Sequence, residues 1–284
     1  PSGQPFWISA TQLRKDLTAM RDAFDSGRRD HALDQMVLVG HSMGGLVSRM
    51  QTIDSGDEFW EIVSDVPAAS PEEALSKIKG PDEDRHKLVS TLFFRPSNSV
   101  RRVITIGTPH RGSEFANDLT RWLARKIIRL PKMTTNTGRR LAAQNPNVFK
   151  DTSLLTVANA IDSLAPDSPI FPVMMRAKRA PDVKYHNIIG VLESPSFISG
   201  RGSRSDGVVD YSSATMDDVE SELVVNAPHT TIHMISKTIF EVRRILLEHL
   251  HELDATDRVA QNVRAVGPTN DRTKNRTAST ILEH

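Results

Sequence analysis

The chain has no cysteine, and this absence removes several chemistries at once. Without thiols there is no disulfide, no cysteine nucleophile and no cysteine-ligated zinc. An excess of charge is lacking too, because 36 Lys and Arg residues face 35 Asp and Glu residues and leave a formal net charge of +1. This balance provides no general attraction to nucleic acid, so we expect no nucleic-acid partner.

Long hydrophobic runs are also missing. The longest apolar clusters, residues 36–39 and 103–106, have the length of strands and not the roughly 20 residues that cross a bilayer. The composition, 38% hydrophobic and 25% charged, is that of an ordinary globular protein and excludes collagen, coiled coil and general disorder. A chain of 284 residues is long enough for one large α/β domain.

The first five residues, PSGQP, contain no Met, no charged segment and no apolar segment. They resemble neither a natural start nor a secretory signal, so we expect a fragment or a processed product. A missing signal peptide therefore says nothing here about the cellular compartment.

Apolar spacing predicts alternating helices and strands. A helix is expected from Ser9 to about residue 24, and a second one follows residue 45. Four short apolar runs have the pattern of strands buried on both faces in a parallel sheet, at residues 35–40, 101–107, 184–191 and 222–226. Further helices are expected from Ser113, around residues 154–161, and over 235–253. The rest of residues 145–182 reads as irregular cap or loop.

We therefore expect an α/β domain over residues 1–253. Residues 254–284 are polar and contain Gly267-Pro268, which predicts a disordered tail.

The segment Gly40-His41-Ser42-Met43-Gly44 matches G-x-S-x-G between a predicted strand and a predicted helix. In this context the serine lies on a sharp turn at strained backbone angles, and its neighbours at minus two and plus two must pass closely without Cβ atoms. Ser42 would be exposed above the sheet as a nucleophile. The amide of Met43, at the start of the next helix, would stabilise an oxyanion.

A serine nucleophile needs a histidine base that is oriented by a carboxylate. Asp206 follows the third strand and His229 follows the fourth, so both are expected beside Ser42 at the edge where parallel strands end. Other acids and histidines compete for these roles: Glu114, Glu193, Asp210, His110 and His233. His229 and His233 are also spaced as a helical metal pair, but no Glu follows the first as in H-E-x-x-H, so we expect no metal.

Together with residues 104–113 (ITIGTPHRGS), 205–209 (SDGVV) and 228–229, the serine motif resembles the α/β-hydrolase superfamily. More narrowly, the resemblance is to its bacterial lipase and esterase branch, which includes triacylglycerol lipases and PGAP1-like hydrolases. It implies a mostly parallel, doubly wound sheet with cap or lid insertions. It also implies a Ser42, Asp206 and His229 triad that cleaves carboxylic esters through an acyl-enzyme without a cofactor. The Thr108–Gly112 segment is implied to line the edge of the active site.

One departure from this family concerns the oxyanion. Only 41 residues precede Ser42, whereas the family has several upstream strands and a loop that supplies a second oxyanion donor. We therefore expect those strands to be missing from this chain and its activity to be lowered. Loss of one oxyanion donor costs about 10² to 10³ in kcat.

Two oppositely charged segments suggest a lid. Residues 54–84 hold ten acids against two lysines, and residues 119–140 hold seven bases and no acid. They would pair over the site and open at a lipid surface, or be unrelated solvated faces. A basic amphipathic helix also fits contact with anionic lipid headgroups.

A small-molecule or lipid ester is the expected substrate. The alternatives are acyl transfer or amide cleavage by the same triad, and a non-catalytic binding protein with the same fold.

Overall fold

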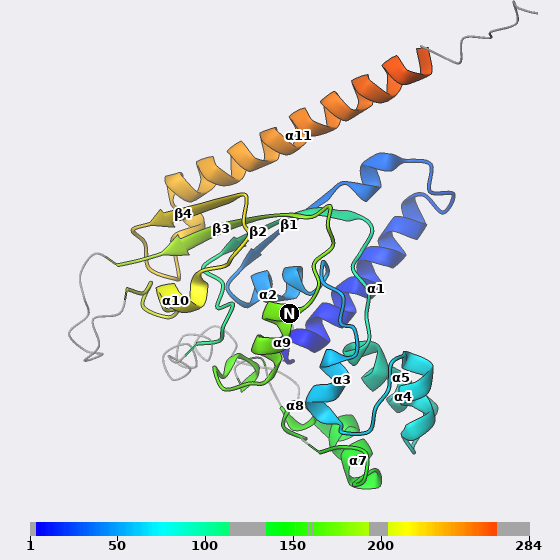
Figure 1. Ribbon diagram of the computed structural model, residues 1–284. Coiled ribbons are helices and arrows are strands. Elements are labelled where there is room, and N and C mark those ends of the chain that lie inside the picture. Colours follow the sequence, from blue (N-terminus) through cyan, green and yellow to red (C-terminus); the bar gives the residue numbers. More distant parts are fainter. Residues whose placement is uncertain are drawn as a thin grey trace, which may run out of the picture. The chain divides into compact units, whose positions relative to one another are not determined.

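The computed structural model describes residues 4–113, 135–150, 152–157, 160, 162–192 and 204–265. It divides into two units, Pro1–Ile239 and Phe240–His284, and each is described by itself. The first unit holds the sheet and all of the candidate site residues (Figure 1).

The sheet has four parallel strands in sequence order. These are β1 (Met36–His41), β2 (Val100–Ile106), β3 (Lys184–Gly190) and β4 (Ser221–Val225). The register places Gly40 beside Thr105, Thr105 beside Asn187 and Asn187 beside Glu222, so the carboxyl ends of the strands meet at one edge. The predicted parallel α/β class is confirmed, with the four expected strands displaced by at most a residue or two at their ends.

Two helices cover one face of this sheet. Helix α1 (Phe6–Phe24) and helix α2 (Met43–Arg49) lie along it (Figure 1). Leu17 of α1 packs against an apolar cluster that contains Val103 of β2 and Tyr185 of β3. Because β2 and β3 are the inner strands, they are almost entirely buried, whereas Val39 of the edge strand β1 is half exposed.

The acidic segment 54–84 forms short helices that are separated by loops. It contains α3 (Glu58–Val63), α4 (Pro71–Lys77) and the beginning of α5 (Asp82–Leu92). Phe59 and Trp60 of α3 are fully buried, so apolar packing and not charge determines the place of this segment. The prolines start helices here: Ser70 caps α4 by accepting from the Glu73 amide, and Pro71 occupies the first turn.

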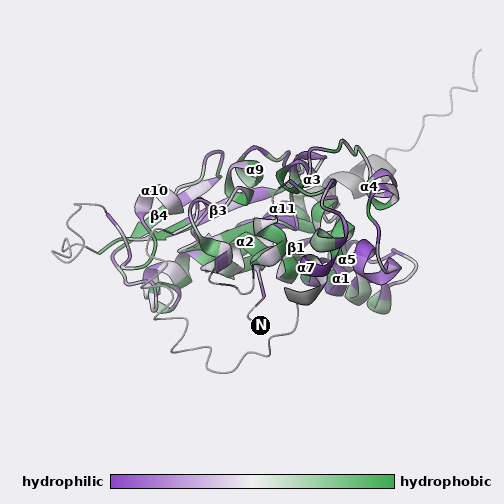
Figure 2. Cartoon of the chain, turned by 90° about the horizontal axis from the view of Figure 1, so that it is seen from below, coloured by the Kyte–Doolittle hydropathy of each residue, from purple (hydrophilic) through white to green (hydrophobic). Residues whose placement is uncertain are grey.

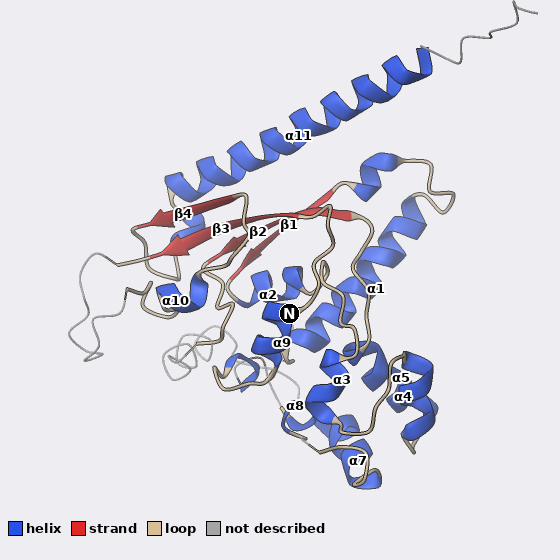
Figure 3. Ribbon diagram, viewed as in Figure 1, coloured by secondary structure: helices blue, strands red, loops and turns tan. Residues whose placement is uncertain are grey.

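The remaining elements are short. Helices α7 (Thr135–Gln144), α8 (Ser153–Thr156), α9 (Ile170–Arg176) and α10 (Tyr211–Ala214) follow, with 3-10 turns at His31–Asp34, Asp162–Leu164 and Ile232–Met234. Three of these helices, α7, α8 and α9, lie between β2 and β3 in the chain, and α10 lies between β3 and β4 (Figure 3). Helix α9 lies in a segment that we expected to be irregular, and its buried Ile170, Phe171, Val173 and Met174 explain why it forms.

The last described element is α11 (Ser236–Ala265). It continues past Leu253, where the sequence pattern ended the helix, so the expected boundary between domain and tail falls inside it. Residues 266–284 lie outside the described residues. Among the helices that the structure describes, none has the length and apolar character needed to cross a membrane. Figure 2 shows that apolar residues concentrate at β1 and α2, whereas α5 is largely hydrophilic.

Candidate active site

Ser42 forms the turn between β1 and α2. Strand β1 ends at His41 and α2 begins at Met43, so a single residue reverses the direction of the chain. Its backbone angles, φ 56° and ψ −129°, are unusual for a residue with a side chain and cost free energy. The Ser42 amide donates to the Ile106 carbonyl oxygen at 2.9 Å and the Ser42 carbonyl accepts from Gly45, which hold the strained turn at both ends.

The two glycines that flank this turn are not equivalent. A Cβ atom on Gly40 would lie 2.5 Å from backbone atoms of Gly44 and Gly45, so Gly40 must lack a side chain. A Cβ atom on Gly44 would have no neighbour within 4 Å. The expected close passage therefore requires a glycine on the strand side only.

His229 lies between Ser42 and Asp206. Its Nε2 is 2.9 Å from Ser42 Oγ, and its Nδ1 is 2.7 Å from Asp206 Oδ2. All three side chains are buried. A carboxylate can only accept a hydrogen bond, so the proton of the imidazole is on Nδ1. The lone pair of Nε2 is then free to accept a hydrogen bond from the serine hydroxyl. The structure thus brings the three predicted residues into one hydrogen-bonded chain.

The Asp206 carboxylate is held by its own loop. Its Oδ1 accepts from the amides of Val208 at 3.0 Å and Val209 at 2.7 Å, which leaves Oδ2 for the imidazole. The backbone of Asp206 also accepts from the His229 amide at 2.9 Å. Asp206 and His229 are therefore joined by two hydrogen bonds, one between side chains and one between backbones.

The loop after β2 braces the loop that carries the acid. Arg111 donates to the carbonyl oxygens of Ser212, at 3.0 Å, and Thr215, at 2.5 Å. Ser113 donates to the Val208 carbonyl oxygen at 2.7 Å. These contacts join residues about a hundred positions apart, so no local pattern in the sequence could have indicated them.

The other acids and histidines that could have taken the roles of Asp206 and His229 have different surroundings or lie outside the described residues. Glu114 and Glu193 lie outside the described residues, and Asp210 stands at the N-cap of α10. His110 is fully buried, and burial together with Arg49, Arg111 and Arg179 holds the pKa of its imidazole well below 6.5. His233 is exposed. In the part of the chain that the structure describes, no three His, Asp or Glu side chains form a group that could hold a metal ion.

His41, the residue before the nucleophile, is part of the site and was missed by sequence reasoning. Its Nε2 lies 3.0 Å from the backbone carbonyl oxygen of His229. Burial, with a smaller contribution from the neighbouring His229 and His233, lowers the pKa of His41 to about 4. The imidazole is therefore neutral at pH 7, and since a carbonyl only accepts, the proton is on Nε2.

Two predictions, the oxyanion donor and the lid, are only partly tested by the described residues. Met43 opens α2, so its amide has no acceptor inside the helix, and its role toward an oxyanion stays a prediction. Of the expected lid, residues 114–134 lie outside the described residues. Where the two charged segments are both described, Arg140 forms an ion pair with Asp84 at 2.5 Å.

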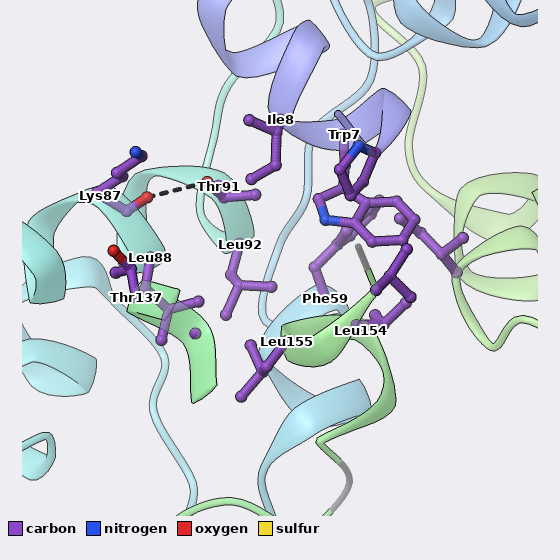
Figure 4. Close-up of a pocket in the computed structure, with 14 residues that line it drawn as sticks. Trp7, Ile8, Phe59, Lys87, Leu88, Thr91, Leu92, Thr137, Leu154 and Leu155 are labelled. Carbon is purple, nitrogen blue, oxygen red and sulfur yellow. Dashed lines mark hydrogen bonds between the residues drawn. The ribbon is translucent and has the colours of Figure 1, made fainter. Parts of the chain in front are cut away.

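A separate apolar pocket lies among the helices, with a cavity volume of about 70 Å³. Figure 4 shows Ile8 of α1, Leu92 of α5 and Leu155 of α8 around it. Lys87 and Thr91 are on its polar side, and none of the three triad residues lines it.

No family model matches the sequence, and no curated protein matches it. Several solved structures are similar in fold. A lipase of Bacillus licheniformis, BlEst2 in its mature form, is 18% identical with a TM-score of 0.46, and the alignment covers 86% of this chain and 75% of that one. Of the propeptide form of that lipase, this chain covers 41%.

Two further solved structures are similar to this chain. EstA from Clostridium botulinum is 18% identical with a TM-score of 0.40, and the alignment covers 70% of this chain and 60% of that one. A Staphylococcus hyicus lipase is 12% identical with a TM-score of 0.39, over 79% of this chain and 71% of that one.

The fold itself is established by the chain's own geometry. Parallel strands end at one edge, a strained serine joins β1 to α2, and loops after the next strands reach that serine. Strand, sharp serine turn and helix in this arrangement are the features of an α/β-hydrolase. The chain has the α/β-hydrolase fold.

Proposed function

We propose that this chain is a serine hydrolase that cleaves carboxylic esters through an acyl-enzyme. The observation that carries the proposal is the unbroken chain of hydrogen bonds from Ser42 through His229 to Asp206. A buried serine at strained backbone angles, 2.9 Å from an imidazole that is itself oriented by a carboxylate, is the arrangement of an activated nucleophile.

In this mechanism His229 Nε2 removes the proton from Ser42 Oγ as the oxygen attacks the ester carbonyl carbon. Asp206 holds the imidazole in place and stabilises its positive charge. The carbonyl oxygen becomes an oxyanion, which the Met43 amide receives at the start of α2. When the tetrahedral intermediate collapses, the C–O bond to the alcohol breaks, and His229 returns its proton to the departing alkoxide.

The acyl-enzyme is then hydrolysed by the same groups. His229 accepts a proton from water, the hydroxide oxygen attacks the acyl carbon, and the bond to Ser42 Oγ breaks. The proton passes from His229 to the serine oxygen, so the enzyme is restored and a carboxylic acid leaves. In both stages the hydrogen bond from His229 Nδ1 to Asp206 keeps the imidazole oriented toward Ser42 Oγ.

Esters are the favoured substrate class because of the motifs that surround the triad. The serine motif, the Thr108–Gly112 segment and the acid loop occur in the order typical of lipases and esterases. The substrate is accordingly a small-molecule or lipid ester.

The test is covalent labelling with a fluorophosphonate, which reacts with activated serines, followed by peptide mass spectrometry. We expect one adduct, on Ser42, and none in Ser42→Ala. Ser76→Ala changes an exposed serine on α4 and serves as the matched control, which should label like the unmodified chain. Hydrolysis of 4-nitrophenyl esters of increasing acyl length then defines the substrate range. A folded chain that shows no adduct, or an adduct at another serine, would contradict the proposal.

A further inference from the structure

His41 and Ser42 are consecutive residues, and both contact His229. The hydroxyl of Ser42 meets the imidazole of His229 at 2.9 Å, whereas the Nε2 of His41 meets the backbone carbonyl of the same residue at 3.0 Å. The imidazole rings of His41 and His229 lie 5.0 Å apart. The turn at His41 and Ser42 therefore contacts both the side chain and the backbone of His229.

The loop that carries His229 needs support of this kind. It follows β4 without regular structure, and the Pro228 carbonyl accepts from Thr231 and Ile232 within the loop. Toward the rest of the protein, the amide of His229 donates to the Asp206 carbonyl oxygen. The His41 bond holds the other side of this residue, so its backbone is fixed at the amide and at the carbonyl.

We propose that His41 is a positioning residue, whose Nε2–H holds the His229 carbonyl so that the nucleophile turn also fixes the place of the base. This inference rests on the proposed function and adds a role that the triad does not contain. A misplacement of about 1 Å between reacting groups costs on the order of 10²-fold in rate, so a bond that fixes the backbone of the base has a large effect on acylation.

The charge state of His41 suits this role. Transfer of the serine proton makes His229 positive, and a second positive imidazole 5.0 Å away would oppose that step. The groups around His41 are His229, His233 and Asp206, and burial is the main reason that its pKa falls to about 4. His41 consequently donates a hydrogen bond without adding charge beside the base.

Three substitutions separate hydrogen bonding from packing. His41→Gln keeps an N–H donor at nearly the reach of Nε2, His41→Asn has a donor that is too short, and His41→Phe keeps a ring without a donor. His86→Phe is the control, because His86 is exposed on α5 and its ring contacts its own helix, at the Asp82 carbonyl.

We expect His41→Phe and His41→Asn to slow fluorophosphonate labelling of Ser42 by about 10- to 100-fold, as a misplaced base would. His41→Gln should stay within about threefold of the unmodified chain, since one neutral hydrogen bond is replaced by another. With ester substrates, kcat should fall while KM is unchanged. Equal rates in all three variants, or a Gln variant as slow as the Phe variant, would overturn the inference.

A second measurement does not depend on activity. The proton on His229 Nδ1, bonded to Asp206, gives a low-field NMR signal that reports the geometry of that bond. It should broaden or shift in His41→Phe and be restored in His41→Gln. If the unmodified chain does not react with the probe, the proposed function fails. The NMR comparison still decides the role of His41, and an unchanged signal in His41→Phe would reject it.

Discussion

The edge of the sheet that carries the candidate active site is held together differently from the helical region, which comprises the described helices of residues 54–94 and 135–177. At the edge, Ser42, Asp206 and His229 are joined by hydrogen bonds between specified atoms. In the helical region, Trp60 packs against Phe93 and Phe149, with ring centroids 6.1 Å apart in both pairs. Directional bonds require particular residues, whereas apolar packing requires volume and accepts several residue types.

This difference predicts how each region responds to a substitution. A change at the edge leaves most apolar contacts intact, so it should reduce the reaction rate far more than the stability. A change in the helical region removes packing and should reduce the free energy of unfolding, while the folded molecules keep their site. The next two experiments test this separation.

The largest effect is expected from Asp206→Asn. The amide can still accept from Val208 and Val209, but it can present N–H instead of a carboxylate to His229 Nδ1, which favours the wrong tautomer of the imidazole. We expect labelling of Ser42 to slow by about 10⁴-fold, the loss known for this change in another serine hydrolase. The melting temperature should change little.

Asp217→Asn is the matched control, since the Asp217 side chain is exposed and its ion pair with Arg111 is long, at 3.8 Å. The Asp217 backbone carbonyl, which accepts from Arg179 at 2.9 Å, is kept in the variant. It should label at the rate of the unmodified chain. If Asp206→Asn retained a rate within about tenfold, the acid would have to be another residue, and Glu193 would be the first to substitute.

Trp60→Ala is expected to have the next largest effect, on stability. The indole is fully buried and donates from Nε1 to the Val66 carbonyl oxygen at 2.7 Å. Its removal leaves a cavity and leaves the Val66 carbonyl with only the longer hydrogen bond from Ser64 Oγ, at 3.4 Å. Loss of a buried tryptophan side chain costs about 3 to 5 kcal/mol. Urea unfolding measures the loss.

Folded Trp60→Ala should still label at Ser42 at close to the normal rate. Trp60→Phe, which keeps most of the volume, is the control and should lose less stability. A folded Trp60→Ala protein that fails to label would show that the two regions are coupled. The expected separation between stability and reaction rate would then be wrong.

The same difference explains how much could be predicted from the sequence. Ser42, Asp206 and His229 were identified because a strained turn requires glycine nearby and because parallel strands end together. His41 was not identified, since its partner is the backbone carbonyl of His229. Every residue type has such a carbonyl, so no sequence motif marks this contact. The glycine rule was half right: Gly40 faces the backbone of Gly44, but a side chain on Gly44 would meet nothing.

In the helical region the sequence was less informative. Segment 54–84 was interpreted by its charge as part of a lid, and the helices α3 and α4 and the start of α5 were not predicted there. The helices are short, so apolar periodicity has few turns over which to appear. Their stability comes from buried residues such as Phe59 and Trp60, whose partners lie elsewhere in the chain and cannot be read locally.

The smallest expected effect is a pH dependence of stability that originates at the edge of the sheet that carries the candidate active site. In the unfolded chain a histidine binds a proton below a pKa of about 6.5, whereas the pKa of His41 in the folded chain is lowered to about 4. Between these values the unfolded state holds the extra proton, so stability that is present above about pH 6.5 is lost as the pH falls toward 4. His41→Gln removes this contribution. As the pH falls from 7.5 to about 4.5, the unmodified chain should therefore lose stability relative to His41→Gln, and urea unfolding of both proteins measures this difference.

His110 is present in both proteins, so its contribution to the difference cancels. His86→Gln should show the same pH dependence of stability as the unmodified chain. Parallel curves for the two proteins would mean that His41 binds protons normally in the folded chain. Its neutral state beside the base would then need a different explanation.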